Sequence, residues 1–217
     1  MTLPVLTGPR VVLVPASRAV ASAVVSGADL HGALAPLVAG QGWPHADSAD
    51  ALRPLAEHGG DPGCWLVVLA GVVIGDAGWF GPPDAAGDCE LGYGLAAPSR
   101  RRGLGREAVA LLLSWVEQQP GVRRTTAEVL VGNEASLRLL AGLGFVDDGT
   151  GVPPYLRLVR PVDGRCPREA ARNVVGQPPA AGAGPPRSPL SACAGPQPGR
   201  AMGDRDPPRT TATHRSG

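Results

Sequence analysis

Hydrophobic residues form two kinds of run along the chain, and the two kinds predict strands and helices. Short runs rich in β-branched and aromatic residues, bounded by glycine or proline, are typical of strands. Longer runs with an apolar residue every three or four positions are typical of helices. The expected strands cover residues 10–14, 64–70, 72–80, 88–95, 125–131, 144–146 and 155–159. The expected helices cover 16–39 (one or two helices), 48–58, 105–119 and 133–143, and Ser17, Ser48 and Asn133 are candidate N-caps.

The order of these elements predicts an α/β fold class. Strands dominate as far as residue 95, and the order is then β-α-β-α-β. Such an order favours a mixed α/β layer with helices on both faces of one sheet. Residues 1–160 are therefore expected to form a single domain around one core, of a size usual for domains.

The composition changes at residue 161. Residues 161–217 contain 11 prolines and 8 glycines, and they contain no aromatic residue. A segment of this composition buries too little apolar surface to offset the conformational entropy of ordering. We expect a disordered C-terminal tail over 161–217, rich in proline, glycine and arginine.

Charge and cysteine content narrow the class of protein. Residues 1–160 carry 12 arginines and 15 acidic residues, a balance of −3, which argues against nucleic acid as a partner. No apolar run reaches the roughly 18 residues of a membrane span, and the N-terminus lacks a basic leader region. A cytoplasmic location without a membrane partner is expected. The four cysteines have no metal-ligand or disulfide spacing, so we expect no metal: Cys64, Cys89, Cys166 and Cys193.

The most informative stretch runs from Glu90 to Ala108, and its pattern is strand, basic glycine loop, helix. Unpaired backbone N–H groups and the positive end of the helix dipole make such a junction an anion site. Gly103 and Gly105 lack the Cβ atoms that would keep a phosphate away from the backbone. Arginines at four positions of the loop add charge and forked donors: Arg100, Arg101, Arg102 and Arg106.

Three classes of phosphate ligand compete for this loop. A nucleoside-triphosphate P-loop needs a lysine, and the chain has no lysine at all. A dinucleotide fingerprint needs a third glycine, which Arg106-Glu107-Ala108 does not supply. The third class is coenzyme A, for which the spacing Arg100-x-x-Gly103-x-Gly105 is the relevant motif.

That motif and four others, in order, resemble the GNAT acetyltransferase superfamily, in the branch that includes the ribosomal-protein N-terminal (RimJ/RimL-like) acetyltransferases. The resemblance covers nearly all of residues 5–160. It rests on residues 6–13 as the opening strand, 73–75 (Val-Ile-Gly), 90–93 (Glu-Leu-Gly-Tyr), the 100–108 loop, and Asn133-x-x-Ser136 followed by Gly144-Phe145. Three positions depart from the pattern of the family. Ala97 stands where proline is usual, Arg101 where glycine is usual, and Leu140 where many members have a catalytic tyrosine.

The resemblance implies a GNAT-like, mostly antiparallel central sheet and acetyl-CoA as co-substrate. The pyrophosphate would lie on the backbone N–H groups of residues 101–106. The pantetheine arm would run along the edge of Leu95 to Ala97, whose N–H groups would also stabilise the oxyanion. The implied coenzyme-binding residues are Leu95, Ala96, Ala97, Arg100, Arg101, Arg102, Gly103, Leu104, Gly105, Arg106 and Asn133, which would also cap its helix.

Two residues are candidates for proton transfer. Glu90 is the candidate general base, because in a strand it shares a face with Gly92 and Gly94, which would leave space for an amine. Its alternative role is that of a surface carboxylate. The branch suggests Ser136 as the acid that protonates the leaving thiolate in place of the missing tyrosine. Its alternative role is packing or hydrogen bonding within its helix.

The resulting function is transfer of an acetyl group from acetyl-CoA to a primary amine, through a tetrahedral intermediate. The amine would be a protein N-terminus or a small molecule, and a homodimer is possible. The alternative is a non-catalytic acyl-CoA-binding sensor or assembly module. The acceptor pocket is expected between residues 20–45 and 146–155, where Asp47, Asp147 and Asp148 would attract a cation. Tyr93 and the four tryptophans are expected in the core, and His45 and His58 are expected to be ordinary turn and helix-end residues.

Overall fold

The computed structural model describes residues 3–59 and 63–162. The expected disordered tail lies outside these residues from 163 onward, whereas Pro161 ends the last strand and the N–H of Val162 donates to the carbonyl of Arg123. No helix within the described ranges is long and apolar enough to cross a membrane.

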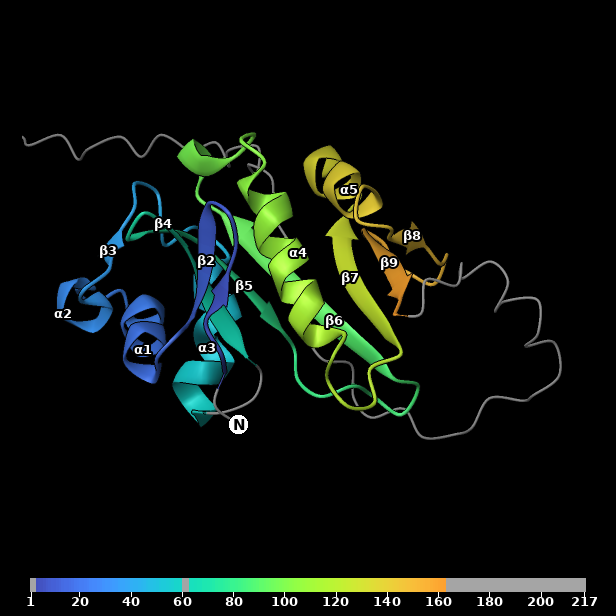
Figure 1. Cartoon of the computed structure of the whole chain (residues 1–217), viewed down its shortest axis with the longest axis horizontal. Helices are drawn as coiled ribbons and strands as arrows, with labels where there is room; N and C mark the ends of the chain where they lie inside the picture. Colours follow the sequence, from blue (N-terminus) through green and yellow to red (C-terminus); the bar gives the residue numbers. More distant parts are fainter. Residues whose placement is uncertain (1–2, 60–62, 163–217) are drawn as a thin grey trace, which may run out of the picture.

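Nine strands form one continuous sheet (Figure 1). Its order is β1-β2-β4-β5-β6-β7-β9-β8, and the short β3 pairs with β5. Among the strands of the described residues, only β3 with β5 and β6 with β7 pair in parallel, so the sheet is mostly antiparallel, as expected. The strands are β1 Leu6–Thr7, β2 Val11–Pro15, β3 Val38–Ala39, β4 Cys64–Leu69, β5 Val72–Trp79, β6 Asp88–Leu95, β7 Arg124–Leu130, β8 Val146–Asp147 and β9 Tyr155–Pro161.

The helices occupy the segments that the apolar pattern predicts, with small changes at their ends. They are α1 Arg18–Ser26, α2 His31–Leu34, α3 Ser48–His58, α4 Leu104–Val116 and α5 Glu134–Ala141, with a 3₁₀ turn at Ala97–Ser99. Ser17 caps α1 by accepting the backbone N–H of Val20, as predicted. Ser48 is not the N-cap of α3, because it is the first residue of that helix and its hydroxyl bonds elsewhere. Residues 38–39, predicted as helix, form β3 instead.

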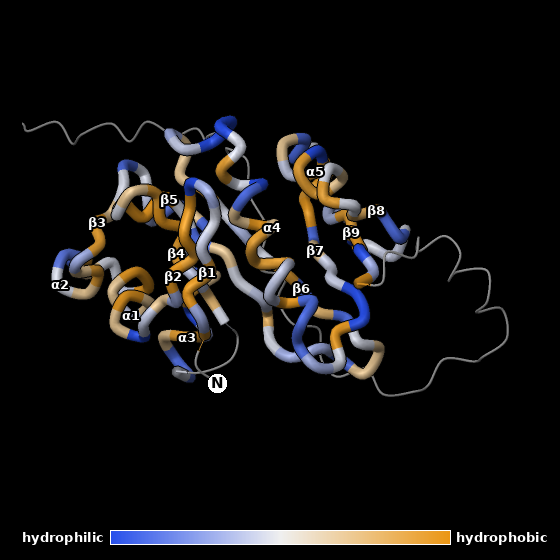
Figure 2. The backbone as a smooth tube through the Cα atoms, viewed as in Figure 1, coloured by the Kyte–Doolittle hydropathy of each residue, from blue (hydrophilic) through white to orange (hydrophobic). Residues whose placement is uncertain are grey.

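Two apolar cores lie on opposite faces of the sheet. One joins α4 and α5 to the sheet and contains Trp65, Trp79 and the α4 residue Leu112. The other joins α1 and α3 to the first strands and contains Trp43. Figure 2 shows hydrophobic segments on β2, β4 and β7, whereas the arginine-rich loop before α4 is hydrophilic. Tyr93 is partly buried and packs against the α4 core, as the alternation of the strand predicts.

The pairing between β6 and β7 stops after three residues. Asp88 to Glu90 pair with Arg124 to Thr126, and no further pair joins the two strands. From Leu91 onward β6 is bonded only to β5, while β7 continues along β9. The sheet therefore opens as a V immediately after Glu90, and Figure 1 shows the two strands diverging from their paired ends.

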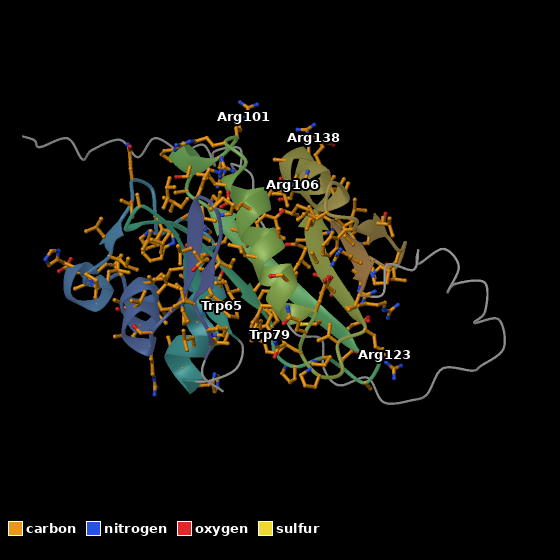
Figure 3. All side chains as sticks on the ribbon, in the orientation of Figure 1. Trp65, Trp79, Arg101, Arg106, Arg123 and Arg138 are labelled. Atoms are coloured by element: carbon orange, nitrogen blue, oxygen red, sulfur yellow. The ribbon has the colours of Figure 1, made fainter. Side chains whose placement is uncertain are left out.

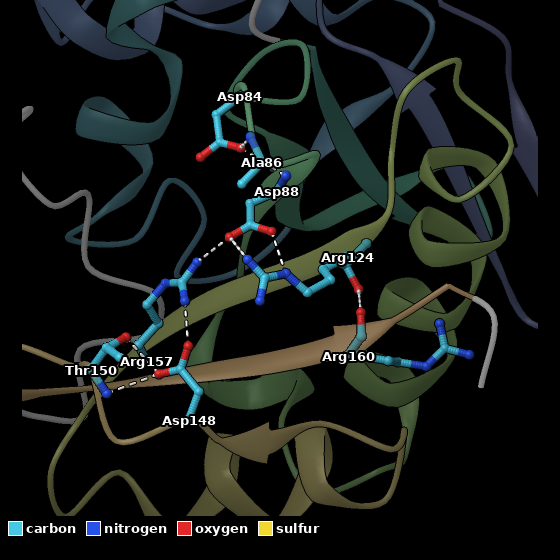
Figure 4. Close-up of polar contacts among 9 residues, drawn as sticks. Asp84, Ala86, Asp88, Arg124, Asp148, Thr150, Arg157 and Arg160 are labelled. Atoms are coloured by element: carbon cyan, nitrogen blue, oxygen red, sulfur yellow. Dashed lines mark hydrogen bonds and ion pairs between the residues drawn. The ribbon is translucent and has the colours of Figure 1, made fainter. Parts of the chain in front are cut away.

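An ion-pair cluster holds the closed end of this V together (Figure 4). The Asp88 carboxylate accepts Nε and Nη2 of Arg124 at 2.5 and 2.7 Å, and Nη2 of Arg157 at 2.6 Å. Arg157 also pairs with Asp148, whose carboxylate caps the backbone N–H of Thr150. One carboxylate on β6 thus binds arginines of β7 and β9 at the closed end of the V. Its side chain is only 9% exposed, so solvent screens these contacts weakly.

We expect Asp88→Asn to lower the free energy of unfolding by about 1–3 kcal/mol, because two guanidinium groups lose a shared and largely buried counter-charge. Urea denaturation measures the change. The matched control is Glu57→Gln, an exposed carboxylate on α3, which should change stability by less than about 0.5 kcal/mol. Equal stability of the two variants would contradict the assigned role of Asp88.

Candidate active site

The loop from Arg100 to Arg106 offers a row of unused backbone donors. Within the described chain, none of the N–H groups of residues 101–106 donates to an acceptor. Arg101 and Gly103 have positive φ angles of 61° and 77°, which turn the backbone sharply before α4 begins. For Arg101 this left-handed conformation is strained, which explains why glycine is usual there. The donors converge at the N-terminus of a 13-residue helix, so the loop is suited to an anion.

Contacts with the first strands hold this loop in place. The Glu107 carboxylate accepts the backbone N–H groups of Arg10 and Val11 at 2.6 and 3.0 Å, and Nε of Arg10 at 2.8 Å. Burial raises the pKa of Glu107, but these donors outweigh it and lower the pKa overall. Arg10 in turn donates Nη1 to the carbonyl of Arg102 at 3.0 Å. The Leu104 side chain, buried in the core, anchors the loop from beneath.

The arginines of the loop have different roles. Arg100 donates Nε to the carbonyl of Leu95 at 2.7 Å, and Arg106 donates Nη2 to the carbonyl of Gly142 at 2.9 Å. These two side chains therefore brace the backbone. Arg101 and Arg102 are exposed, and Figure 3 shows Arg101 pointing away from the ribbon. The predicted phosphate contacts through side chains thus fall mainly to Arg101 and Arg102.

The edge of β6 that faces the V has fewer donors than expected. Ala96 donates its N–H to Ile74 on β5 at 2.8 Å, so this group is already used. In an antiparallel pair, successive N–H groups point to alternate sides of the strand. The N–H of Leu95 therefore points away from β5, toward the space where β6 and β7 diverge. The expectation that Leu95 to Ala97 all offer N–H groups is therefore wrong for Ala96. Leu95 and the exposed Ala97 remain as candidates.

Glu90 lies on β6 at the apex of the V and is half-buried. Burial raises its pKa, and the nearby charge of Glu128 raises it further, while Arg157 lowers it, so that the pKa reaches about 7. A carboxylate with this pKa exchanges its proton near neutral pH, as a general base requires.

The two glycines beside Glu90 do not leave open space, contrary to the expectation. A Cβ on Gly92 would lie 2.8 Å from Cζ of Phe80, and a Cβ on Gly94 would overlap the imidazole of His45. The glycines instead admit these two rings against the strand. An acceptor would have to lie between the rings and the strand edge.

Ser136 and Asn133 lie at the start of α5. Asn133 caps the helix by accepting the backbone N–H of Ser136 at 3.3 Å, as predicted. Ser136 is 4% exposed, and Leu140 is fully buried at the position where the family tyrosine is usual. A tyrosine acid is therefore absent from that position, and the role of Ser136 stays a prediction.

A cavity of about 270 Å³ opens on the face of the sheet opposite to α4. It reaches from Tyr155 on β9 past Gly92 and Phe80 to Asp47 and Asp50 at α3. Glu90 itself does not line the cavity, but the backbone N–H of the lining residue Phe80 donates to the Glu90 carbonyl at 2.9 Å, so the cavity adjoins the backbone of the candidate base. The other lining residues are His45, Ala51, Gly63, Cys64, Asp76, Ala77, Gly78, Trp79 and Tyr93.

This position differs from the expected acceptor pocket. Of residues 20–45 only His45 lines the cavity, and of 146–155 only Tyr155 does. The Asp147 and Asp148 carboxylates cap backbone N–H groups of their own turn, whereas Asp47 lines the cavity as expected. Among residues 3–59 and 63–162, no group of three or more histidines, cysteines or acidic residues is placed to hold a metal ion.

A buried polar network forms one wall of this cavity, and the sequence did not reveal it. Asp76 is 3% exposed, and its Oδ2 accepts Ser48 Oγ at 2.6 Å and Trp43 Nε1 at 3.0 Å. Nε2 of His45 lies 3.3 Å from the same oxygen. His45 is therefore a functional candidate and not an ordinary turn residue. The only signal in the sequence is the cluster of polar residues after Trp43. This cluster does not predict that they contact Asp76 on β5.

Comparison with known proteins identifies the family. The family model of the GNAT acetyltransferase domain matches residues 13–146, which is more than half of the chain. The chain belongs to the GNAT acetyltransferases. It is 30% identical over 112 residues to an uncharacterized N-acetyltransferase of Bacillus subtilis, YjdG, covering 48% of this chain and 67% of the relative. It is 40% identical over 68 residues to an N-acetyltransferase 9-like protein of Nematostella vectensis, of which it covers 34%.

Solved structures of other GNAT enzymes share the fold. RimL, the ribosomal L7/L12 alpha-N-protein acetyltransferase, in complex with coenzyme A, superposes with a TM-score of 0.54 at 15% identity, over 75% of this chain and all of RimL. The ribosomal-protein-S5-alanine acetyltransferase of Vibrio fischeri superposes with a TM-score of 0.52 at 20% identity, over 74% and 98% of the two chains. This GNAT protein is thus an acetyl-CoA-dependent acetyltransferase by family.

The ionisation of His45 should appear in the stability of the enzyme. Burial lowers the pKa of His45, but the Asp76 carboxylate and the charge of Asp47 outweigh burial and the opposing Arg100, and raise the pKa above its ordinary 6.5. Stability from this pair is complete below pH 6.5 and is lost as pH rises through the raised pKa.

The stability difference between the wild type and His45→Gln should therefore be larger at pH 6 than at pH 9, as measured by urea denaturation at each pH. A difference that grows with pH would show that His45 is neutral in the folded enzyme.

Proposed function

We propose that this GNAT enzyme acetylates a primary amine, with Glu90 as the group that accepts the proton of that amine. The observation that supports this most directly is the pKa of Glu90, about 7, at the apex of the V. An amine is protonated at neutral pH and attacks only as the neutral species. A carboxylate with a pKa of about 7 removes that proton at a smaller cost in free energy than a carboxylate with the ordinary glutamate pKa.

The residues present fit coenzyme A as the donor of the acetyl group. Six consecutive backbone N–H groups without acceptors in the described chain suit a pyrophosphate, and the exposed Arg101 and Arg102 add positive charge. Acetyl-CoA supplies an activated acyl group as a thioester. RimL, with the same fold, has been crystallised with coenzyme A, which supports the same ligand here.

The remaining roles follow from position. The N–H groups of Leu95 and Ala97 would stabilise negative charge on the acyl oxygen. That of Leu95 points away from β5 at a position where β7 no longer pairs, and that of Ala97 has no acceptor within the described residues. Ser136 would donate a proton to the departing thiolate. A thiolate leaves with little assistance, so loss of this hydroxyl should cost only about tenfold. Asn133 would cap α5 and contact the pantetheine arm.

A non-catalytic role as an acyl-CoA-binding module is the second candidate. The observation that favours it is the buried Leu140 where a catalytic tyrosine is usual. Binding of acetyl-CoA without release of free thiol in the presence of any amine would support this role over catalysis.

We expect Gly103→Asp to weaken acetyl-CoA binding by at least about 100-fold in calorimetric titration, because a negative side chain would meet the pyrophosphate. Gly103→Ala is the matched control. It carries the same backbone strain at a φ of 77° without the charge, so its loss should be much smaller. Unchanged affinity in Gly103→Asp would show that the phosphates bind elsewhere.

We expect Glu90→Gln to lower kcat/KM by about 100-fold below pH 8, where the amine is protonated. The wild-type profile should rise through pH 7, following the ionisation of Glu90, and the variant should lack this inflection. Release of free thiol measures the rate.

Glu128→Gln serves as the control, because it keeps the base and removes the charge that raises its pKa. The inflection should then move to lower pH. An inflection that survives in Glu90→Gln would exclude Glu90 as the base.

A further inference from the structure

The cavity beside Glu90 is strongly acidic for its size. Asp47, Asp50 and Asp76 all line it, and within the described chain the only basic side chain among the lining residues is His45. Asp50 pairs with Arg53 at 3.1 Å, but both groups are about half exposed, so this pair neutralises little of the field inside the cavity. Three carboxylates against one imidazole leave a net negative charge in the space that adjoins the base.

One carboxylate oxygen in the wall lacks a hydrogen-bond donor. Asp76 is 3% exposed, and Trp43, Ser48 and His45 all approach the same oxygen, Oδ2. Within the described residues, no group donates to Oδ1. Oδ1 is not one of the fully buried polar atoms that lack a partner, so solvent reaches it. A ligand with N–H donors in the cavity could therefore bind this oxygen in place of water.

Two of the acidic residues, Asp47 and Asp50, belong to the start of α3 and not to the edge of β6 where the reacting nitrogen must bind. That nitrogen must be neutral when it attacks and must lie near the edge of β6 that faces the V. Asp47 and Asp50 lie on the α3 side of the cavity, and Asp76 lies on β5, paired with Gly94 across the strands. A neutral amine gains nothing from these charges. They would instead contact another part of the acceptor.

The surrounding aromatic residues suit an organic cation. Phe80 lies against Gly92, and Tyr155 closes the cavity on the β9 side. Aromatic rings and carboxylates together attract alkylammonium groups more strongly than either does alone. A protonated amine on a short apolar chain matches such a lining, since its methylene groups would contact the rings.

We propose that the acceptor carries a second, protonated nitrogen, which binds between Asp47, Asp50 and Asp76 while its other, neutral primary amine is acetylated beside Glu90. This inference rests on the proposed function. The same chemistry has two sources, a small diamine or polyamine, or a peptide whose N-terminal residue is followed by a basic side chain.

The experiment measures acetyl-CoA-dependent thiol release with pairs of acceptors that differ in one charge. Each α,ω-diamine, from the propane to the octane chain, is compared with the n-alkylamine of the same length. Ala-Lys-Ala amide is compared with Ala-Met-Ala amide. We expect kcat/KM to be at least about tenfold higher for the dicationic member of one of these two sets, through KM more than kcat. The set that shows the preference identifies the source.

The double variant Asp47→Asn/Asp50→Asn should reduce that preference to about threefold or less, because the two side chains lose their negative charge. Glu57→Gln is the matched control, because it removes an exposed carboxylate from the same helix outside the cavity, and the preference should remain. The preference is the ratio of the kcat/KM values of two acceptors measured with the same variant. Any general loss of folded enzyme therefore cancels.

Three results would overturn the inference or separate it from the proposed function. Equal turnover of paired acceptors would refute the second cation while leaving the acetyltransferase intact. Binding of acetyl-CoA without turnover of any acceptor would also refute it and would favour the non-catalytic role. Failure to bind acetyl-CoA at all would instead refute the proposed function.

Discussion

The three-residue pairing between β6 and β7 is the constraint on which the rest of the structure depends. Asp88 joins three strands at this point, and beyond Glu90 the two strands diverge. Divergence leaves backbone N–H groups of β6 without the partner that a continuous sheet would supply. It also places the glycine loop, which follows β6, at the open end of the V. The backbone groups suited to a coenzyme and the carboxylate suited to its acceptor thus arise from one interruption in the ladder.

Two neighbouring carboxylates on this face of the sheet behave differently because their partners differ. Asp88 is held by two guanidinium groups, whereas Glu90, two residues along the same strand, faces burial and the charge of Glu128. The first carboxylate joins two cationic side chains from other strands, and the second has a pKa raised to about 7 by burial and by Glu128. Alternation along the strand places both on one face, so a carboxylate that joins three strands lies beside the candidate base.

The sequence predicts the local features of this enzyme well. Strand and helix positions follow from apolar periodicity, and the anion loop follows from Gly103, Gly105 and the start of α4, because each depends on residues close together in the chain. The sequence could not predict which N–H groups of β6 are bonded to β5 and which point away from it. This depends on which residue of β5 lies opposite Ala96. The His45 and Asp76 contact joins a turn to a strand 31 residues later, and no local pattern specifies it. The rings of Phe80 and His45 that fill the space beside Gly92 and Gly94 come from other segments of the chain, so no local pattern specifies them either.

The Glu107 carboxylate has a consequence for how the enzyme responds to its ligand. It accepts hydrogen bonds that connect the first turn of α4 to the start of β2. The Arg10 side chain in turn donates to the carbonyl of Arg102 in the loop. A ligand that orders the loop must therefore also order the beginning of β2, far away in the chain. The conformation of the candidate coenzyme loop is therefore joined to that of the N-terminal strand by hydrogen bonds, although more than 90 residues separate them in the sequence.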